Sequence, residues 1–359
     1  MRRASRGGLS IRGGYHVSTR DVHLLSAGTV LPGPAIDNAA LARRFGMSQV
    51  WEQWVDTFVG TRARHFAVDL DTGERRHSLA DLGATAAERA MSAAGLTPSD
   101  IDVLVMATAT PDNLMPATVN LVADRLGIDQ VPTYQLQSGC TGAVQALDVA
   151  RQMLLAGTHR TALVVGGDVC AKFLDVGMNL AELPPEQLVN VIQFGDGAGA
   201  AVLGVDPTPS CALLHRTLVR FTGLHRPPGQ VVEWFGPADR HEELPAGSED
   251  YKAIEQLVPA MAEEVLHELL EDLDWKDFDV DYLLPPQLSG RMTQRIVERL
   301  DVPSAQEVSC VAETGNTANA LPFFQFEAAL ARMVAGDRAL GVSIESSKWI
   351  KAGFAFERV

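Results

Sequence analysis

The sequence SGCTGAVQALDVARQMLLAGTHRTALVVGGD at residues 138–168 is matched by TGNTANALPFFQFEAALARMVAGDRALGVSIES at residues 314–346. Both stretches run in the same order through a glycine, a polar residue, a threonine, a helix-like segment, Ala-Gly, an arginine and an apolar strand-like segment. Such self-similarity predicts a duplicated βα unit. Cys140 in the first copy stands where Asn316 stands in the second. A chance likeness of two generic βα units is the alternative, and the shared Gly-X-Thr argues against it.

Helix-like and strand-like patterns alternate along the rest of the chain. Most of the strand-like segments are apolar, which is typical of an α/β fold with mostly buried strands. The predicted helices cover residues 79–93, 116–127, 251–273, 289–300 and 316–336, and the predicted strands cover residues 101–110, 132–137, 161–168, 280–286, 306–313 and 338–346. Residues 194–204 are rich in glycine but lack a following helix, so they are interpreted as a tight turn and strand rather than a phosphate-binding loop.

The length and charge of the chain limit its function. Its 359 residues exceed one ordinary hydrophobic core, so two packed units are expected. A net charge of −15 argues against nucleic acid as a partner, because a phosphate-binding surface needs an excess of lysine and arginine. An acidic carrier protein would be repelled overall, so it would need a local basic patch on this chain.

The cysteines and the N-terminus indicate a compartment. Four cysteines show no metal-site spacing, which predicts free thiols in a reducing environment: Cys140, Cys170, Cys211 and Cys310. Residues 1–19 are basic but lack the apolar segment of a signal peptide, which predicts a flexible N-terminal tail. No apolar run is long enough to span a membrane. We therefore expect a cytoplasmic protein with no metal ion and no membrane partner.

Cys140 is the candidate nucleophile. It opens a helix-like stretch, where the helix dipole and unpaired N–H groups favour thiolate over thiol. This position predicts a lowered pKa for the thiol and a reactive sulfur. A small buried side chain is the alternative, since most lone cysteines are of that kind.

Four motifs stand in order and at suitable spacing: FVGTRARHFA at residues 58–67, SGCTGAVQAL at 138–147, NVIQFGDGAGAAVL at 190–203 and ETGNTANALP at 313–322. Together they resemble the β-ketoacyl-ACP synthase III family of the thiolase superfamily, over roughly residues 20–359. The resemblance implies a thiolase-like five-layered α/β/α/β/α fold made of two duplicated halves. We assign the half with the cysteine to residues 20–206 and the half with the asparagine to residues 207–359. The resemblance also implies a homodimer and no cofactor.

The resemblance assigns catalytic roles. In the family an acyl group is loaded from an acyl carrier protein or CoA onto the helix-opening cysteine, which is Cys140 here. The family's asparagine corresponds to Asn316, whose amide would donate to a thioester or enolate oxygen. The family's histidine lies in a PHQ segment, and Pro286 stands in its place without any side-chain acid, base or donor. Three histidines in the loop-rich middle of the chain are interpreted as ordinary surface residues: His215, His225 and His241.

The family's glycine-rich GGG turn, whose backbone N–H helps to form the oxyanion hole, is replaced here by SSKW at residues 346–349. Loss of the glycines disfavours a positive φ in this turn. The backbone N–H groups of Cys140 and Lys348 are the expected oxyanion donors.

Three further residues are assigned to substrate binding by the resemblance. Trp54 corresponds to a tryptophan at the acyl-donor entrance, and Phe58 stands where the CoA-binding enzymes carry an arginine. Met115 corresponds to the residue that reaches across the dimer to shape the acyl pocket. For Trp54 and Met115, plain core packing is the alternative.

The missing histidine decides the predicted reaction. The family's usual step decarboxylates malonyl-ACP, and losing one of its two oxyanion donors costs ~10²–10³ in rate. We therefore predict an acyltransferase that passes an acyl group from a carrier protein or CoA through Cys140 to an amine or hydroxyl of a small natural-product scaffold. The alternatives are a Claisen-condensing synthase and a non-catalytic partner of a ketosynthase. The retained cysteine argues against the partner.

Overall fold

The computed structural model describes residues 20–183, 185–233 and 247–359. The predicted tail over residues 1–19 and the prediction for His241 lie outside these described residues. The main strands are β1 (His23–Val30), β4 (Val103–Thr108), β5 (Thr133–Gln137), β6 (Thr161–Asp168), β7 (Gly197–Gly204), β8 (Ala212–Phe221), β11 (Tyr282–Leu284), β12 (Gln306–Glu307), β13 (Arg338–Glu345) and β14 (Ile350–Arg358).

These strands form one sheet in the order β12-β11-β13-β14-β8-β1-β7-β6-β4-β5. The sheet consists of two runs of five strands, joined where β1 pairs with β8 at His23–Leu213 and Leu24–Ala212. Each run has two parallel pairs at its outer end and two antiparallel pairs toward the junction. The two runs therefore share one plan, which confirms the predicted α/β fold class of duplicated halves.

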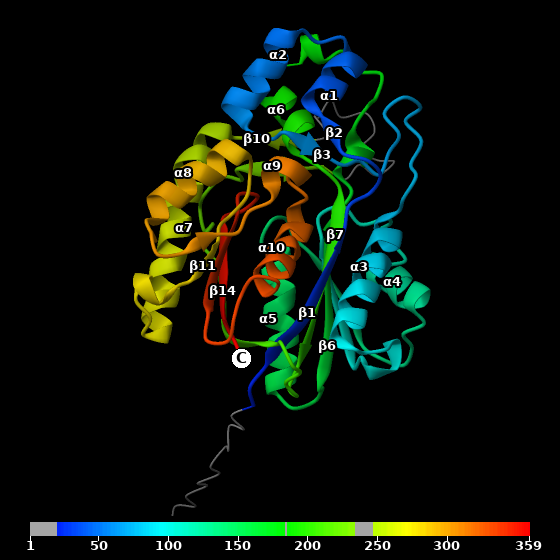
Figure 1. The fold of residues 1–359 in the computed structure, drawn as a ribbon. Helices are drawn as coiled ribbons and strands as arrows, with labels where there is room; N and C mark the ends of the chain where they lie inside the picture. The colour runs from blue at the N-terminus through cyan, green and yellow to red at the C-terminus, as the bar shows by residue number, and fades with distance from the viewer. Residues whose placement is uncertain (1–19, 184, 234–246) are drawn as a thin grey trace, which may run out of the picture.

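Helices cover the sheet and separate its two runs (Figure 1). α3 (Leu79–Ala94) and α4 (Thr118–Leu126) pack on the outer face of one run. α7 (Tyr251–Leu273) and α8 (Gly290–Leu300) pack on the outer face of the other. α5 (Gly142–Leu155) and α10 (Leu321–Leu330) lie between the runs, which completes the five layers.

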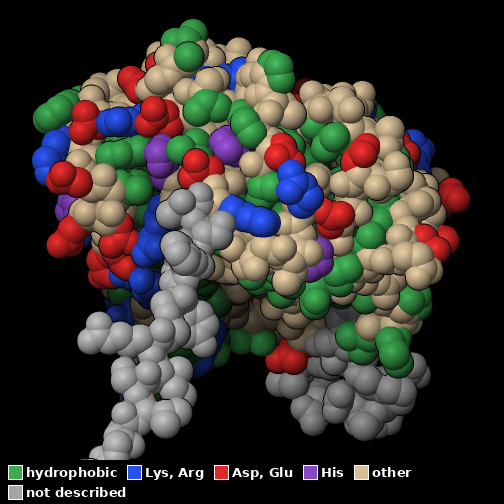
Figure 2. Space-filling view, turned by 90° about the horizontal axis from the view of Figure 1, so that it is seen from below, with side chains coloured by type: hydrophobic (Ala, Val, Ile, Leu, Met, Phe, Trp, Pro, Cys, Tyr) green, Lys and Arg blue, Asp and Glu red, His purple; other side chains and the backbone are tan. Residues whose placement is uncertain are grey.

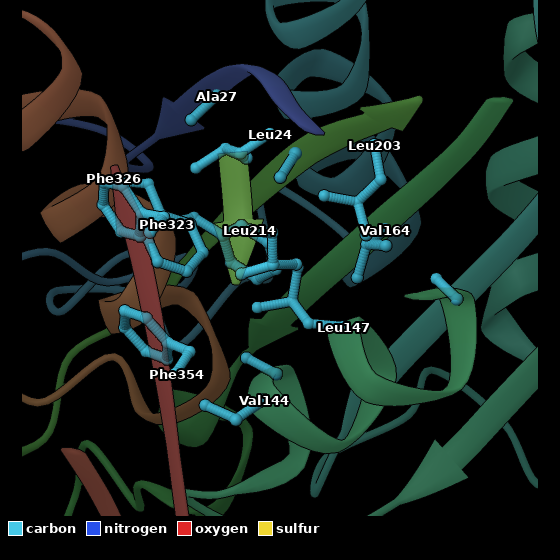
Figure 3. Packing of buried hydrophobic residues seen from close by; sticks show 14 of the residues in the cluster. Leu24, Ala27, Val144, Leu147, Val164, Leu203, Leu214, Phe323, Phe326 and Phe354 are labelled. Carbon is cyan, nitrogen blue, oxygen red and sulfur yellow. The ribbon is translucent and has the colours of Figure 1, made fainter. Parts of the chain in front are cut away.

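The central core is built from both halves of the chain, as Figure 3 shows. Leu147 of α5 and Leu24 of β1 are each 1% exposed, and Phe326 of α10 is 2% exposed. The Phe326 and Phe354 rings meet edge to face with their centroids 4.9 Å apart. Because these side chains come from segments far apart in sequence, burying them holds the two halves together.

Shorter elements form a cap beside the sheet, at the top of Figure 1. Its helices and strands are β2 (Ile36–Asp37), α1 (Asn38–Phe45), α2 (Gln49–Trp54), a π-helical turn (Val55–Val59), β3 (Ala63–Arg64) and α6 (Pro185–Gln193). Arg64 is fully buried and donates hydrogen bonds to the carbonyls of Ile36, Thr61 and Ile192. Burial lowers the pKa of its guanidinium to about 10. One arginine thus ties the motif at residues 58–67 to α6.

The remaining short elements connect these layers. They are β9 (Gln230–Val232), β10 (Gly247–Glu249), α9 (Val311–Thr314), and 3-10 turns at Pro98–Asp100, Cys170–Phe173, Leu180–Glu182, Asp277–Asp279 and Ala318–Ala320. The strand predicted over residues 306–313 is wrong beyond Glu307. Oε1 of Gln287 accepts the N–H groups of Cys310 (2.5 Å) and Val311 (2.9 Å), so the chain leaves the sheet and starts α9.

We propose that the two halves divide near residue 206, in the connection between β7 and β8.

Lysine, arginine, aspartate and glutamate side chains are interspersed on the face seen in Figure 2. Among the described residues, no helix has the length and apolar character needed to cross a bilayer.

Candidate active site

Cys140 lies in the loop between β5 and α5, two residues before the helix begins at Gly142. A side chain at Gly142 would put its Cβ 2.4 Å from Oδ1 of Asn319, so glycine allows the second half to approach this loop. Nδ2 of Asn319 donates a 2.9 Å hydrogen bond to the carbonyl of Ser138. The two helix openings that the repeat relates are therefore packed against each other.

Asn316 is held in place by its backbone and by its own amide oxygen. Its N–H donates to the carbonyl of Gln193 (2.7 Å), and its carbonyl accepts from Gly195 (3.1 Å). Its Oδ1 accepts the N–H of Ala318 at 3.0 Å. The side chain is buried, and Nδ2 has no hydrogen-bond partner among the described residues. This nitrogen is therefore free to donate to a substrate oxygen.

The glycine-rich segment at residues 194–204 has a structural part in this arrangement. It forms a turn and then β7, as its pattern indicated. The turn pairs with the Asn316 segment through a bridge between Phe194 and Asn316. Gly315 has a φ of 70°, and a Cβ there would lie 2.8 Å from Cβ of Arg64. Because Gly315 has no side chain, the Asn316 segment can approach Arg64 and the turn before β7 closely enough to form its backbone hydrogen bonds.

Two cavities meet at Cys140. The larger, of about 200 Å³, is lined by Cys140 and Asn316 together with Trp54 and Phe58. The smaller, of about 20 Å³, lies between Cys140 and Pro286 and has room for about one water molecule. The structure therefore brings four of the predicted site residues to one cavity. Trp54 lines that cavity and also packs against the hydrophobic cluster of the cap, so its role in substrate binding stays a prediction.

Met115 and Lys348 line neither cavity. Met115 is 88% exposed, which rules out core packing within this chain. Lys348 is exposed and its Nζ donates to the carbonyl of Arg226 at 2.5 Å, whereas Ser346 of the same turn lines the larger cavity. Their roles in oxyanion and substrate binding stay predictions.

The SSKW turn nevertheless contains a positive φ, at Trp349 (62°). The indole is 2% exposed, and its Nε1 donates to the carbonyl of Pro227 at 2.7 Å. A positive φ is unfavourable for so large a residue. The buried packing and the hydrogen bond of the ring hold the backbone in this conformation.

The prediction of a lowered pKa for the Cys140 thiol is wrong. Burial, and after it the carboxylates of Glu345, Asp168 and Glu249, raise this pKa to about 12. Burial disfavours the thiolate, and three negative charges repel it, so together they outweigh the helix dipole. Cys140 is therefore a thiol in the free protein at neutral pH.

Glu345 is a buried carboxylate that sequence analysis missed. It ends β13 and is 4% exposed. Its Oε2 accepts hydrogen bonds from the hydroxyls of Ser138 (2.8 Å) and Thr141 (2.7 Å), which flank Cys140 in the chain. Its Oε1 accepts from the hydroxyl of Ser347. A charged residue at the end of an otherwise apolar strand was the available signal.

Glu249 is a second carboxylate that sequence analysis missed, and it lines the larger cavity with Cys140 and Asn316. It ends β10, which places it next to the start of α7. Burial raises the pKa of its carboxyl, and hydrogen bonds with Tyr251, Gln230 and Asn190 oppose that shift. A half-buried acid thus faces the same space as the candidate nucleophile.

Three stretches of the chain match known families. Residues 134–219 match the family 3-oxoacyl-[acyl-carrier-protein (ACP)] synthase III, and residues 270–346 match the C-terminal region of the same synthase. Residues 47–172 match the N-terminal domain of thiolase. The tetronic acid condensing enzyme AbyA1 is 61% identical over 94% of this chain and 99% of its own, with a TM-score of 0.91. The chain belongs to the 3-oxoacyl-ACP synthase III family.

Two more solved members of that fold extend the comparison. FabH from Pseudomonas aeruginosa PAO1 is 26% identical over 94% of this chain and 98% of its own, with a TM-score of 0.79. The priming β-ketosynthase from the R1128 polyketide biosynthetic pathway is 23% identical over 95% of this chain and 96% of its own, with a TM-score of 0.77. The predicted family is thus confirmed, and its members are ketosynthase-type enzymes.

Within this family the chain departs at the histidine position. Among the described residues, no histidine lines either cavity at Cys140. His225 is exposed, in agreement with its interpretation as a surface residue. His215 is half-buried instead, where Nε2 lies 3.4 Å from the Glu357 carboxylate and the ring meets Trp275 edge to face. Neither His215 nor His225 is therefore placed to supply the acid, base or hydrogen-bond donor that Pro286 lacks.

Proposed function

We propose that this protein is an acyltransferase of secondary metabolism that acts in the cytoplasm. It takes an acyl group from an acyl carrier protein, or from CoA, onto Cys140 as a thioester. It then passes this group to an amine or hydroxyl of a small natural-product scaffold. The observation that carries the proposal is the shared cavity of Cys140 and Asn316, with Pro286 beside it where the family has its histidine.

The chemistry of the oxyanion supports transfer over decarboxylation. Loss of carbon dioxide from a malonyl group leaves an enolate that needs fixed donors, and of the two side-chain donors that the family uses only Asn316 corresponds here, since Pro286 stands at the histidine position. Attack by an amine or hydroxyl instead gives a tetrahedral oxyanion on the acyl-cysteine. The backbone N–H groups of Cys140 and Lys348 and the Nδ2 of Asn316 are the groups that we assign to this charge.

A carrier protein is the favoured donor. Phe58 is 67% exposed at the cavity and carries no charge for the phosphates of CoA, which would favour an arginine there. A phosphopantetheine arm delivers its thioester without those nucleotide phosphates. We further propose a homodimer in which the exposed Met115 enters the acyl pocket of a second copy.

The similarity to AbyA1 favours a second candidate, a carbon–carbon condensation. A tetronic acid ring is a cyclic ester that also contains an enol, so its assembly from two acyl units requires one C–O bond and one C–C bond. Transfer to a hydroxyl supplies the first of these bonds. In the condensing candidate, a carbon nucleophile attacks the acyl-cysteine in place of the hydroxyl, forms the C–C bond and expels the sulfur of Cys140.

Intact-protein mass spectrometry tests the proposed function. Incubation with acyl N-acetylcysteamine thioesters, from acetyl to octanoyl, should add one acyl mass to the wild type and to variants Cys170→Ala, Cys211→Ala and Cys310→Ala. The Cys140→Ala variant should stay unmodified, and acylation of it at the wild-type rate would overturn the site assignment. A wild type that accepts no acyl group would instead support the non-catalytic partner.

The acylated protein then separates transfer from condensation. When malonyl-carrier protein is added to the acylated protein, little carbon dioxide should be released from the malonyl group. Small amines or alcohols should instead remove the acyl group from the protein. Rapid malonyl-dependent release of carbon dioxide would favour the decarboxylative condensing alternative.

A further inference from the structure

We propose that the Glu249 carboxylate is the general base of this site: it takes the proton of the acceptor as the acceptor attacks the acyl-cysteine, and it returns that proton to the sulfur of Cys140. This inference rests on the proposed function, because it concerns the step after Cys140 has been acylated. It assigns to Glu249 the proton transfer that the histidine position, occupied by Pro286, does not provide.

The geometry of the cavity supports this role. Glu249 lines the cavity of about 200 Å³ that also contains Cys140 and Asn316. Its charge is one of the three that raise the pKa of the Cys140 thiol, so the two groups interact across this cavity. An acceptor that fills this space between Cys140 and Glu249 has its nucleophilic atom near the sulfur and its proton near the carboxylate.

The carboxylate is held by its neighbours. Gln230 on β9 pairs across the hairpin with Glu249 and donates its Nε2 proton to Oε1. The Tyr251 hydroxyl lies 2.5 Å from Oδ1 of Asn190 on α6, and both of these side chains are hydrogen-bonded to Glu249. Burial raises the pKa of Glu249, which makes the carboxylate a stronger base than one in water.

The proton and electron balance closes without any further reactant. The acceptor oxygen forms a bond to the thioester carbon, the carbonyl electron pair moves onto oxygen, and the acceptor proton moves to Glu249. The oxyanion then re-forms the carbonyl, and the C–S bond breaks toward sulfur. A thiolate whose conjugate acid has a pKa of about 12 is a poor leaving group, so the proton from Glu249 assists this second step.

Other carboxylates near Cys140 fit this role less well. Glu345 lines neither cavity, so an acceptor bound in the larger cavity does not meet its carboxylate. Glu255 lines the larger cavity, but its carboxylate forms an ion pair with Arg295 and is half exposed.

The test compares two probe nucleophiles on pre-acylated protein. Wild type, Glu249→Gln and Glu249→Asp are loaded to completion with an acyl N-acetylcysteamine thioester and freed of donor. Loss of the adduct is then followed by intact mass with glycerol or with hydroxylamine. Hydroxylamine attacks thioesters as a neutral amine without a base, whereas a hydroxyl of glycerol needs its proton removed. Glu263→Gln, which removes an ion-paired carboxylate of α7 outside both cavities, is the matched control.

We expect Glu249→Gln to load fully and to react with hydroxylamine at the wild-type rate, but to lose ~10²-fold or more of the glycerol rate. Glu249→Asp should recover part of that loss, and the control should match the wild type. Equal slowing with both nucleophiles would assign Glu249 a structural role, and no slowing with glycerol would remove it from the reaction. A wild type that never forms the adduct would instead contradict the proposed function.

Discussion

The hydroxyl of Thr141 donates a 2.7 Å hydrogen bond to Oε2 of Glu345, although the two residues are 204 positions apart in the chain. The bond places a buried negative charge directly at the loop of Cys140. Glu345 is accordingly the largest cause, after burial, of the raised pKa of the thiol. A residue near the C-terminus of the chain therefore contributes to the protonation of Cys140.

Glu345→Gln should increase the reactivity of Cys140. Removing the negative charge lowers the pKa of the thiol, and at pH 8 each unit of that shift raises the thiolate fraction ~10-fold. Alkylation by iodoacetamide, followed peptide by peptide in the mass spectrometer, should become ~10-fold faster at Cys140. Cys310 serves as the internal control, since burial raises its pKa to about 11 without a carboxylate contribution. Faster alkylation at both cysteines would indicate a loosened fold instead.

Asn316→Ala should slow transfer and leave the fold intact. Its Nδ2 has no partner among the described residues, so the variant loses a donor to the substrate oxyanion, and the only side-chain bond within the described residues that it loses is the one from the N–H of Ala318 to Oδ1. Loss of one such donor typically slows turnover ~10²-fold or more. The discharge rate of the acyl-enzyme and the melting temperature should be measured together. Unchanged turnover with a lower melting temperature would make Asn316 only a local cap of the Ala318 turn.

Asn319→Ala should, in contrast, lower the stability of the fold. Nδ2 of Asn319 donates to the carbonyl of Ser138 at 2.9 Å and to Oδ2 of Asp168 at 2.8 Å. Asp168 is fully buried, and it loses one of its donors in this variant. Oδ2 of Asp168 keeps the backbone N–H of Asn319 at 3.0 Å, so the variant loses two hydrogen bonds but leaves this carboxylate paired. Each lost hydrogen bond costs about 0.5–1.5 kcal/mol, so the urea midpoint should fall. A midpoint equal to that of the wild type would show that this contact between the halves adds little stability.

The sequence was sufficient to predict the fold class because its signals are local or repeated. Apolar runs indicate strands such as β6, and the repeated Gly-X-Thr relates Cys140 to Asn316 from the sequence alone. The same reasoning missed Glu345 and Glu249, whose burial depends on chain segments that meet only in the folded state. It also misjudged the pKa of Cys140, since the helix start is local whereas the opposing carboxylates are distant in sequence.

Asp196→Asn should reduce the pH dependence of stability between pH 5 and 8. Asp196 is fully buried and accepts the N–H groups of Ala67 (2.6 Å) and Ala171 (2.9 Å), yet burial raises its pKa to about 7. The folded state therefore binds this proton more tightly than the unfolded chain, in which an aspartate has a pKa of about 3.9. The stability that this group contributes is complete below about pH 4 and is lost as the pH rises toward 7.

Urea unfolding at pH 5 and at pH 8 measures this effect. The slope is about 1.36 kcal/mol per pH unit over the interval in which only the folded state holds the proton. The wild type should therefore lose about 2 kcal/mol more than Asp196→Asn between the two pH values, because asparagine does not titrate. Burial also raises the pKa of Asp168, and its charge is one of the causes of the raised pKa of Asp196, so the difference between the two proteins includes this coupling. Equal losses would mean that Asp196 is already ionised at pH 5, held so by the two backbone N–H groups.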